Sequence, residues 1–273
     1  MVRWWMAFLW VLASCGGGSP ADEGRSALER GDLISAERAF RKALDQDAQS
    51  VEALYGLGWV YHLTGTGNRA RDYFMRCLRV DPADYRGYKG LGSLALGEGN
   101  FPIAMQRFEE ALERSPGDLS VLNSMALTHM GAGRYQSAAE LLQPLLMANP
   151  HKGELGLNLA ESQFRLKESE TALATIVYAL EGGIQERRFE ALLLELRARI
   201  LVRMTSGRLD PDNCSSTLPP LLETLSIADK DLDAAESIGV DLPNLNAARL
   251  RVHRRRSRIL EECPLSSEPL IED

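Results

Sequence analysis

Histidines are the residues of this chain best suited to acid–base catalysis or metal binding, and their spacing favours neither. His62, His129, His151 and His253 are far apart, and no pair has the i, i+4 spacing of a zinc-binding helix. No HExxH, CxxC, GxSxG or phosphate-binding glycine loop is present. The sequence therefore predicts no enzyme, no metal site and no cofactor.

The overall composition is that of a folded protein that does not bind nucleic acid. Hydrophobic residues make up 45% of the 273 residues and charged residues 25%, which is typical of a globular chain. The 31 basic and 38 acidic residues give a net charge of −7, whereas nucleic-acid-binding proteins usually carry a basic excess. We therefore expect a partner of another class.

Residues 1–14 have the layout of a secretory signal peptide, with Arg3 ahead of a nine-residue apolar run from Trp4 to Leu12. That run is too short to span a bilayer. The residues LASC (12–15) resemble the lipobox of bacterial lipoproteins, in which the cysteine receives a diacylglycerol before cleavage. The resemblance implies a mature chain that begins at Cys15 and is held at a membrane by its lipid. The alternative is an ordinary signal peptide beside an unrelated cysteine.

Residues 15–24 are predicted to be the lipidated cysteine and a flexible tether, because GGGSP follows Cys15. In enteric lipoproteins, an aspartate after the cysteine marks retention in the inner membrane, and this chain has Gly16 there. The resemblance therefore favours attachment to the outer membrane of a bacterial cell envelope, with the protein facing the periplasm.

A 34-residue period organises residues 25–184 into five units. In the frame that starts at residue 51, the recurring positions hold Gly58, Ala70, Phe74, Cys77 and Pro82. This pattern resembles the tetratricopeptide repeat (TPR), whose unit is a pair of antiparallel helices. The resemblance implies an all-α fold, a right-handed superhelix of stacked repeats (an α-solenoid), in which small residues let the paired helices approach closely.

The pattern weakens after the fifth repeat. Residues 185–238 are predicted to be a degenerate sixth helix pair, with one helix over 185–204, a turn-rich loop over 205–218 and a second helix from Pro219 to about Ser237. Residues 239–273 are predicted to be a capping helix, which ends near Glu262, and a tail. A cap is expected because the last repeat would otherwise expose its apolar face.

Three cysteines lie in the predicted mature protein. Cys77 takes a small core position of its repeat, so we expect a buried thiol rather than a reactive one. Cys214 and Cys263 lie outside the repeats, and an exported chain folds where disulfides form. We predict a disulfide between Cys214 and Cys263, with two free thiols as the alternative.

Arginines crowd the predicted capping helix. They would form either a patch for an anionic partner, such as lipid headgroups, or a solvated face paired with nearby acids such as Asp229, Glu261 and Glu262. The abundance of these acids favours the second interpretation. The residues are Arg249, Arg251, Arg254, Arg255, Arg256 and Arg258.

The TPR resemblance also implies a binding surface, because the first helix of each repeat lines the concave face of the solenoid. This groove would offer aromatic anchors, cations for carboxylates and amides for a peptide backbone. The sequence leaves open whether Trp59 faces the groove or packs against a neighbouring helix. The predicted groove residues are Tyr55, Trp59, His62, Arg86, Lys89, Asn123, Leu127 and Asn158.

These expectations favour a lipid-anchored envelope scaffold or adaptor that binds a protein or peptide partner through the concave TPR groove. The lipobox, the consecutive repeats and the chain size are similar to those of the pilotin lipoproteins that assist assembly of type IV pilus secretins in the outer membrane. A second interpretation is an adaptor for peptidoglycan hydrolases or synthases. A third is an enzyme in residues 206–273, where no catalytic string is present.

Overall fold

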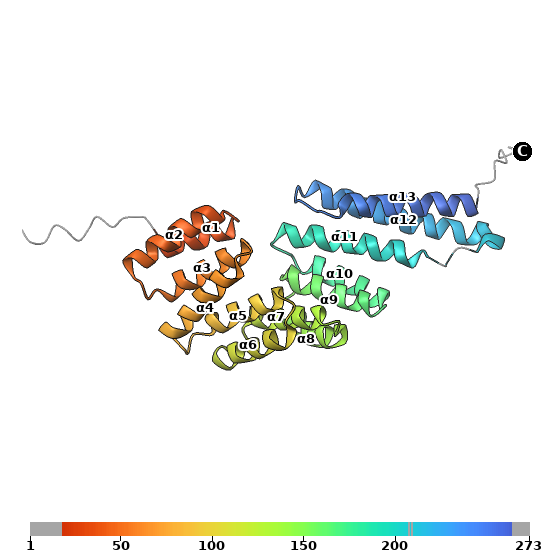
Figure 1. Cartoon of the computed structure of the whole chain (residues 1–273). Helices are drawn as coiled ribbons and strands as arrows, with labels where there is room; N and C mark the ends of the chain where they lie inside the picture. The colour runs from red at the N-terminus through yellow and green to blue at the C-terminus, as the bar shows by residue number, and fades with distance from the viewer. Residues whose placement is uncertain (1–17, 207, 209, 264–273) are drawn as a thin grey trace, which may run out of the picture. The chain divides into compact units, whose positions relative to one another are not determined.

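The computed structural model describes residues 18–206, 208 and 210–263, which belong to two compact units, residues 1–128 (unit 1) and residues 129–273 (unit 2) (Figure 1). The predicted signal peptide and Cys15 lie outside the described residues. Across the described ranges, every regular element is helical, so the all-α prediction is confirmed. Within them, no helix combines the length and the apolar character needed to cross a membrane.

From residue 18 onward, unit 1 contains three helix pairs and most of a seventh helix. The predicted frames at residues 51, 85 and 119 each coincide with the start of a helix. The helices are α1 (Pro20–Glu29), α2 (Leu33–Gln46), α3 (Val51–Leu63), α4 (Gly67–Val80), α5 (Tyr85–Gly97), α6 (Phe101–Arg114) and α7 (Leu119–Gly131).

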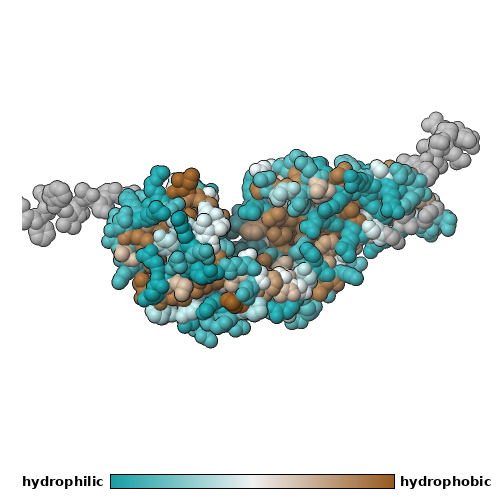
Figure 2. Space-filling model, in the orientation of Figure 1, coloured by the Kyte–Doolittle hydropathy of each residue, from teal (hydrophilic) through white to brown (hydrophobic). Residues whose placement is uncertain are grey.

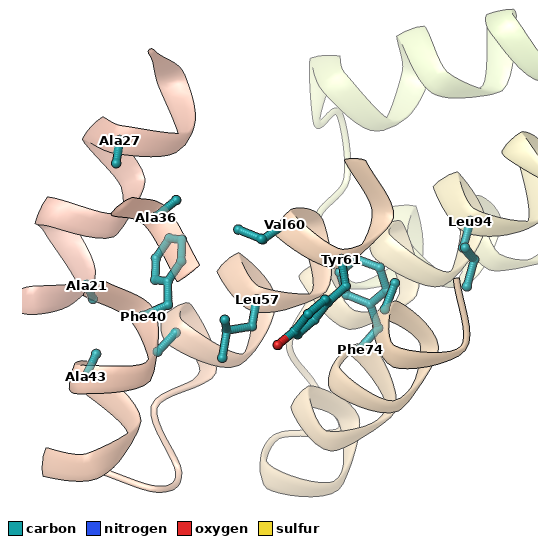
Figure 3. Close-up of a cluster of buried hydrophobic side chains, with 12 residues drawn as sticks. Ala21, Ala27, Ala36, Phe40, Ala43, Leu57, Val60, Tyr61, Phe74 and Leu94 are labelled. Atoms are coloured by element: carbon teal, nitrogen blue, oxygen red, sulfur yellow. The ribbon is translucent and has the colours of Figure 1, made fainter. Parts of the chain in front are cut away.

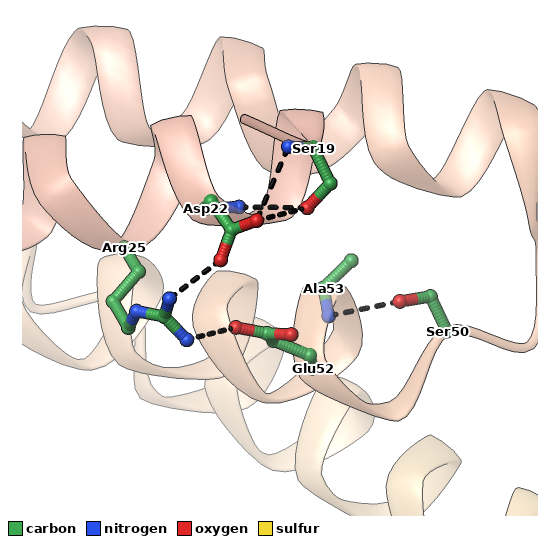
Figure 4. A network of polar contacts seen from close by, with 6 residues as sticks. All are labelled: Ser19, Asp22, Arg25, Ser50, Glu52 and Ala53. Carbon is green, nitrogen blue, oxygen red and sulfur yellow. Dashed lines mark hydrogen bonds and ion pairs between the residues drawn. The ribbon is translucent and has the colours of Figure 1, made fainter. Parts of the chain in front are cut away.

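Helix α1 begins at Pro20, inside the segment of residues 15–24 that was predicted to be a flexible tether. Residues 20–24 are helical, because Ser19 and Asp22 form a capping box in which each side chain accepts the other residue's backbone N–H at 3.1 Å (Figure 4). Pro20 at the first helical position already has the required φ. Arg25 then donates to Asp22 at 2.5 Å and to Glu52 of α3 at 2.7 Å, which ties α1 to the next pair.

The core of unit 1 is built from phenylalanines of the second helices packed against glycines of the first helices. Figure 3 shows Phe40 and Phe74 in the cluster of buried hydrophobic side chains that forms this core. A Cβ atom added to any of these glycines would overlap the phenylalanine ring, so only glycine fits. The contacts are Phe40 with Gly24 and Gly56, Phe74 with Gly58 and Gly90, and Phe108 with Gly92.

Unit 2 continues the helix pairs and then departs from the repeat. Aliphatic residues such as Leu142 and Ile176 take the place of the phenylalanines. The last helix packs against both α11 and α12. The elements are α8 (Tyr135–Ala148), α9 (Gly153–Arg165), α10 (Ser169–Glu181), α11 (Arg187–Met204), the 3₁₀ helix η1 (Pro211–Asn213), α12 (Cys214–Ser237) and α13 (Leu245–Glu262).

The predicted loop over 205–218 is too long. Helix α12 begins at Cys214, upstream of Pro219 and Pro220, which the sequence analysis placed at its start. The helix tolerates both prolines because they are exposed and lie near its N-terminus, where the carbonyls that lose a partner face water. The hydroxyl of Thr217 also donates to the Asn213 carbonyl at 2.9 Å.

The three described cysteines have different environments. Cys214, in the first turn of α12, and Cys263, just after α13, lie at disulfide distance, with Cα atoms 5.6 Å apart across 49 residues of sequence. Cys77 is fully buried, and burial raises the pKa of its thiol to about 12, so it stays protonated and unreactive.

On the side shown in Figure 2, hydrophilic residues cover most of both units, and hydrophobic residues gather in smaller patches. This distribution is that of amphipathic helices which turn their apolar sides toward a neighbouring helix.

We expect Gly90→Ala to destabilise unit 1 by about 1–3 kcal/mol, because its new methyl group would overlap the ring of Phe74. Alanine normally stabilises a helix relative to glycine by about 1 kcal/mol. A loss of stability in this variant would therefore indicate steric overlap with Phe74. Urea unfolding followed by the fluorescence of Trp59, the one tryptophan beyond residue 10, measures it. Gly67→Ala is the control, since its Cβ would make ordinary contact with Leu94, and equal stability of the two variants would contradict the prediction.

We expect Cys214 and Cys263 to resist alkylation in the unfolded, unreduced protein, whereas Cys77 reacts once the protein unfolds. Loss of the cross-link in a Cys214→Ser/Cys263→Ser variant should lower the stability of unit 2 by up to about 4 kcal/mol, because a long loop is no longer closed in the unfolded chain. Mass spectrometry after alkylation measures the first effect and thermal melting the second. Alkylation of all three thiols without reductant would show that the pair is not bonded.

Candidate protein-binding face

Five predicted groove residues lie together on the first helices of unit 1. Tyr55, Trp59 and His62 are on α3, and Arg86 and Lys89 are on α5. We call this surface the first-helix face, and it also includes Asp84 and Asp118, which precede α5 and α7. All seven are partly buried.

The aromatic part of the first-helix face packs on the core and is partly buried. The Trp59 ring lies 6.1 Å from Tyr55, 5.3 Å from His62 and 6.2 Å from Phe74, measured between centroids. Trp59 therefore packs against the second helix of its own repeat, α4, while it remains partly accessible. Replacing Trp59 with a smaller residue would therefore remove core contacts as well as partly accessible surface.

The aromatic part is uncharged at neutral pH. Burial raises the pKa of the Tyr55 hydroxyl far above its ordinary value. Burial also lowers the pKa of His62, although the charge of Glu98 opposes this. A partner that meets this surface therefore finds neutral rings and neutral hydrogen-bonding groups.

Arg86 is held by an aspartate at the start of its own helix. Its Nε donates to Oδ1 and Oδ2 of Asp84 at 3.0 and 2.9 Å, and its Nη2 donates to Oδ2 at 2.5 Å. Its backbone N–H donates to Oδ1 of Asp84 at 2.8 Å. Burial opposes ionisation of Asp84, but these hydrogen bonds and the Arg86 charge keep its pKa below the usual value. Arg86 therefore already has a carboxylate partner within the chain.

Lys89 is linked to the start of α7. Its Nζ donates to the Ser120 hydroxyl at 2.5 Å, and that hydroxyl donates to Asp118 at 2.5 Å. Asp118 also accepts the backbone N–H of Val121 at 2.9 Å. Burial acts to raise the pKa of Asp118, but the bonds from Ser120 and Val121 and the charge of Lys89 hold it below its ordinary value.

Asp84 and Asp118 are not among the predicted groove residues, although the sequence carries a signal for them. Both occupy the last position of a 34-residue frame, directly before a first helix, where an aspartate caps the free N–H groups of the first turn. With these two residues, the four charged groups of the first-helix face cancel.

The other three predicted groove residues lie elsewhere. Asn123 on α7 is 7% exposed, so its side chain offers little surface to a partner. Leu127 is partly buried on α7, and Asn158 is partly buried on α9 of unit 2. In the part of the chain that the structure describes, no group of three histidines, cysteines or acidic residues is placed to hold a metal ion.

Two segments of the chain, residues 21–84 and residues 129–193, match family models of the tetratricopeptide repeat. A BBSome complex member from Bos taurus is 25% identical over 183 residues, which are 55% of this chain and 35% of that protein. Cellulose synthase operon protein C from Pseudomonas fluorescens is 29% identical over 118 residues, which are 43% of this chain and 9% of that protein. The chain thus spans about a third or less of the length of these relatives.

Two solved structures share the fold. A tetratricopeptide repeat protein from Parabacteroides merdae has a TM-score of 0.63 at 18% identity, over 86% of this chain and 83% of that one. The pilF protein of Pseudomonas aeruginosa has a TM-score of 0.58 at 21% identity, over 88% of this chain and 96% of that one. Together with the helix pairs, these matches identify the chain as an all-α tetratricopeptide-repeat solenoid, a fold that serves as a scaffold for protein–protein interaction.

Proposed function

We propose that this protein is a lipid-anchored scaffold of the bacterial cell envelope that binds a protein partner through the first-helix face. The observation that carries the proposal is the cluster of Trp59, Tyr55 and His62, which is only partly buried and shares its face with the Arg86–Asp84 ion pair. Aromatic residues beside satisfied polar groups are the usual composition of a binding hot spot.

The chemistry of the first-helix face indicates a partner with apolar or aromatic anchors. Asp84 and Asp118 neutralise the two cations that the sequence analysis expected to meet carboxylates. A strongly acidic partner would therefore gain little there, since it would have to displace these aspartates. A helix or strand that seats an apolar side chain against Trp59 fits better.

The envelope location rests on the N-terminal sequence. The residues LASC (12–15) after an apolar run support lipidation at Cys15, and the residue after Cys15 favours the outer membrane. Within this location we propose assistance to assembly of an outer-membrane complex such as a pilus secretin. The support is the combination of the lipobox, consecutive repeats and chain size. Capture of a peptidoglycan hydrolase or synthase would instead identify the alternative adaptor role.

We expect Trp59→Leu to reduce partner capture at least about tenfold, because it removes the indole ring from the proposed hot spot. Leucine keeps an apolar side chain against Phe74, so helicity should persist. Residues 16–273 would serve as bait in envelope extract, with retained proteins quantified by mass spectrometry. Ile34→Ala is the matched control, since it removes a 74% exposed apolar side chain of α2 from the same unit. Equal capture by both variants would contradict a role for the first-helix face.

We expect Cys15→Ser to abolish acylation and to move the protein from the membrane fraction to the soluble periplasmic fraction. The lipid chains supply most of the membrane affinity in such an anchor, and serine cannot form the thioether that carries them. Metabolic labelling with a palmitate analogue and fractionation measure both effects. Unchanged membrane association of an unlabelled variant would show that another feature anchors the chain.

A further inference from the structure

Unit 2 contains an open cavity of about 310 Å³ that involves α9, α11 and α13. Its apolar wall includes Phe164 of α9, Val202 of α11 and Ala248 of α13. Helix α13 lies beyond the repeats, so the cavity does not belong to the repeat pattern alone. Because every residue around it belongs to unit 2, it is also separate from the first-helix face.

Three arginines line the same cavity, Arg199 and Arg203 from α11 and Arg251 from α13. The guanidinium carbon of Arg203 lies 5.3 Å from the centre of the Phe164 ring, and that of Arg199 lies 5.9 Å from it. Such stacking fixes the plane of a guanidinium and leaves its N–H groups free to bind a ligand.

The arginines of this cavity are incompletely neutralised. Arg199 approaches Glu161 at 3.7 Å, but Glu161 also accepts a hydrogen bond from Arg165 at 2.9 Å. Among the described residues, Arg203 and Arg251 have no acidic oxygen within 4.0 Å.

Glu195, a buried residue of α11, is the second acid near these arginines. It is 3% exposed. Burial raises its pKa, whereas the charges of Arg199 and Arg251 oppose that rise. The three arginines of the cavity and Arg165 carry four positive charges, against the two acids Glu161 and Glu195. This region therefore has an excess of two positive charges, although the whole chain has a net charge of −7.

Most of the other arginines of α13 have a partner within the chain. Arg249 pairs with Asp233 and Glu236, Arg256 pairs with Asp229, and Arg258 pairs with Glu262. Arg255 donates to the Thr205 carbonyl at 2.6 Å. This supports the interpretation of the helix as a mostly paired face. Among the described residues, Arg251 and Arg254 have no acidic oxygen within 4.0 Å, and of these two only Arg251 lines the cavity.

We propose that this cavity binds an acidic side chain of a partner polypeptide. Arg203 and Arg251 hold the carboxylate, and Phe164 and Val202 contact its methylene stem. The planar guanidinium matches a carboxylate through paired hydrogen bonds, and the apolar wall favours a carboxylate on a short carbon chain over a bare inorganic anion. The volume is that of about ten water molecules, which is room for a glutamate and part of its neighbour.

The test uses residues 16–273 and a fluorescein-labelled, end-capped hexapeptide of alternating leucine and glutamate. Capping removes the terminal carboxylate, so that only side chains can bind. Fluorescence anisotropy at low ionic strength should show saturable binding. The same peptide with glutamine in place of glutamate should bind at least about tenfold more weakly.

The variant Arg203→Gln/Arg251→Gln should weaken binding about tenfold without a change in melting temperature, because both side chains are exposed. Arg254→Gln is the matched control, since it removes an exposed charge of α13 that does not line the cavity, and binding should stay within about twofold. Equal weakening by the control would mean diffuse attraction and overturn the proposal. Equal binding of the glutamine peptide, or displacement by millimolar inorganic phosphate, would overturn it as well.

Discussion

The close approach of a phenylalanine ring to glycine backbone is the contact on which unit 1 depends. Phe74 packs against Gly58 of its own pair and against Gly90 of the next pair, with no room for a Cβ at either position. The same side chain therefore sets the distance within a repeat and the distance between repeats. Because Phe40 repeats the arrangement 34 residues earlier, one local rule determines how three first helices stack.

This stacking brings the starts of successive first helices close together, and the capping aspartates act there. Asp84 begins α5 and holds Arg86, while Asp118 begins α7 and, through Ser120, meets Lys89. A residue type needed to satisfy free backbone N–H groups thus also neutralises the cations of the first-helix face. As a result, its aromatic cluster is the distinctive part of that surface.

The last three helices of unit 2 do not follow the repeat pattern. These helices are longer than those of the repeats, and α13 packs along both α11 and α12, with Cys263 close to Cys214. This cover buries the apolar side of α12. It also brings Arg251 next to Phe164 and Arg203, and so creates a cationic cavity from residues that are far apart in sequence.

The repeat pattern alone determined the helix pairs, their frames and the buried positions, because each depends on spacing within 34 residues and on residue size. It was less reliable at the ends of elements: the capping box at Ser19 extends α1 into the predicted tether, and α12 begins before its prolines. These errors arose because hydrogen bonds of a few residues override composition there.

Tertiary contacts decided which predicted groove residues are available to a partner. The sequence could not show that Trp59 rests on Phe74, that Asn123 is buried or that Arg86 is paired, since each depends on how neighbouring side chains pack. Periodicity indicates which face of a helix turns inward. The exposure and charge of one side chain depend on its neighbours in space.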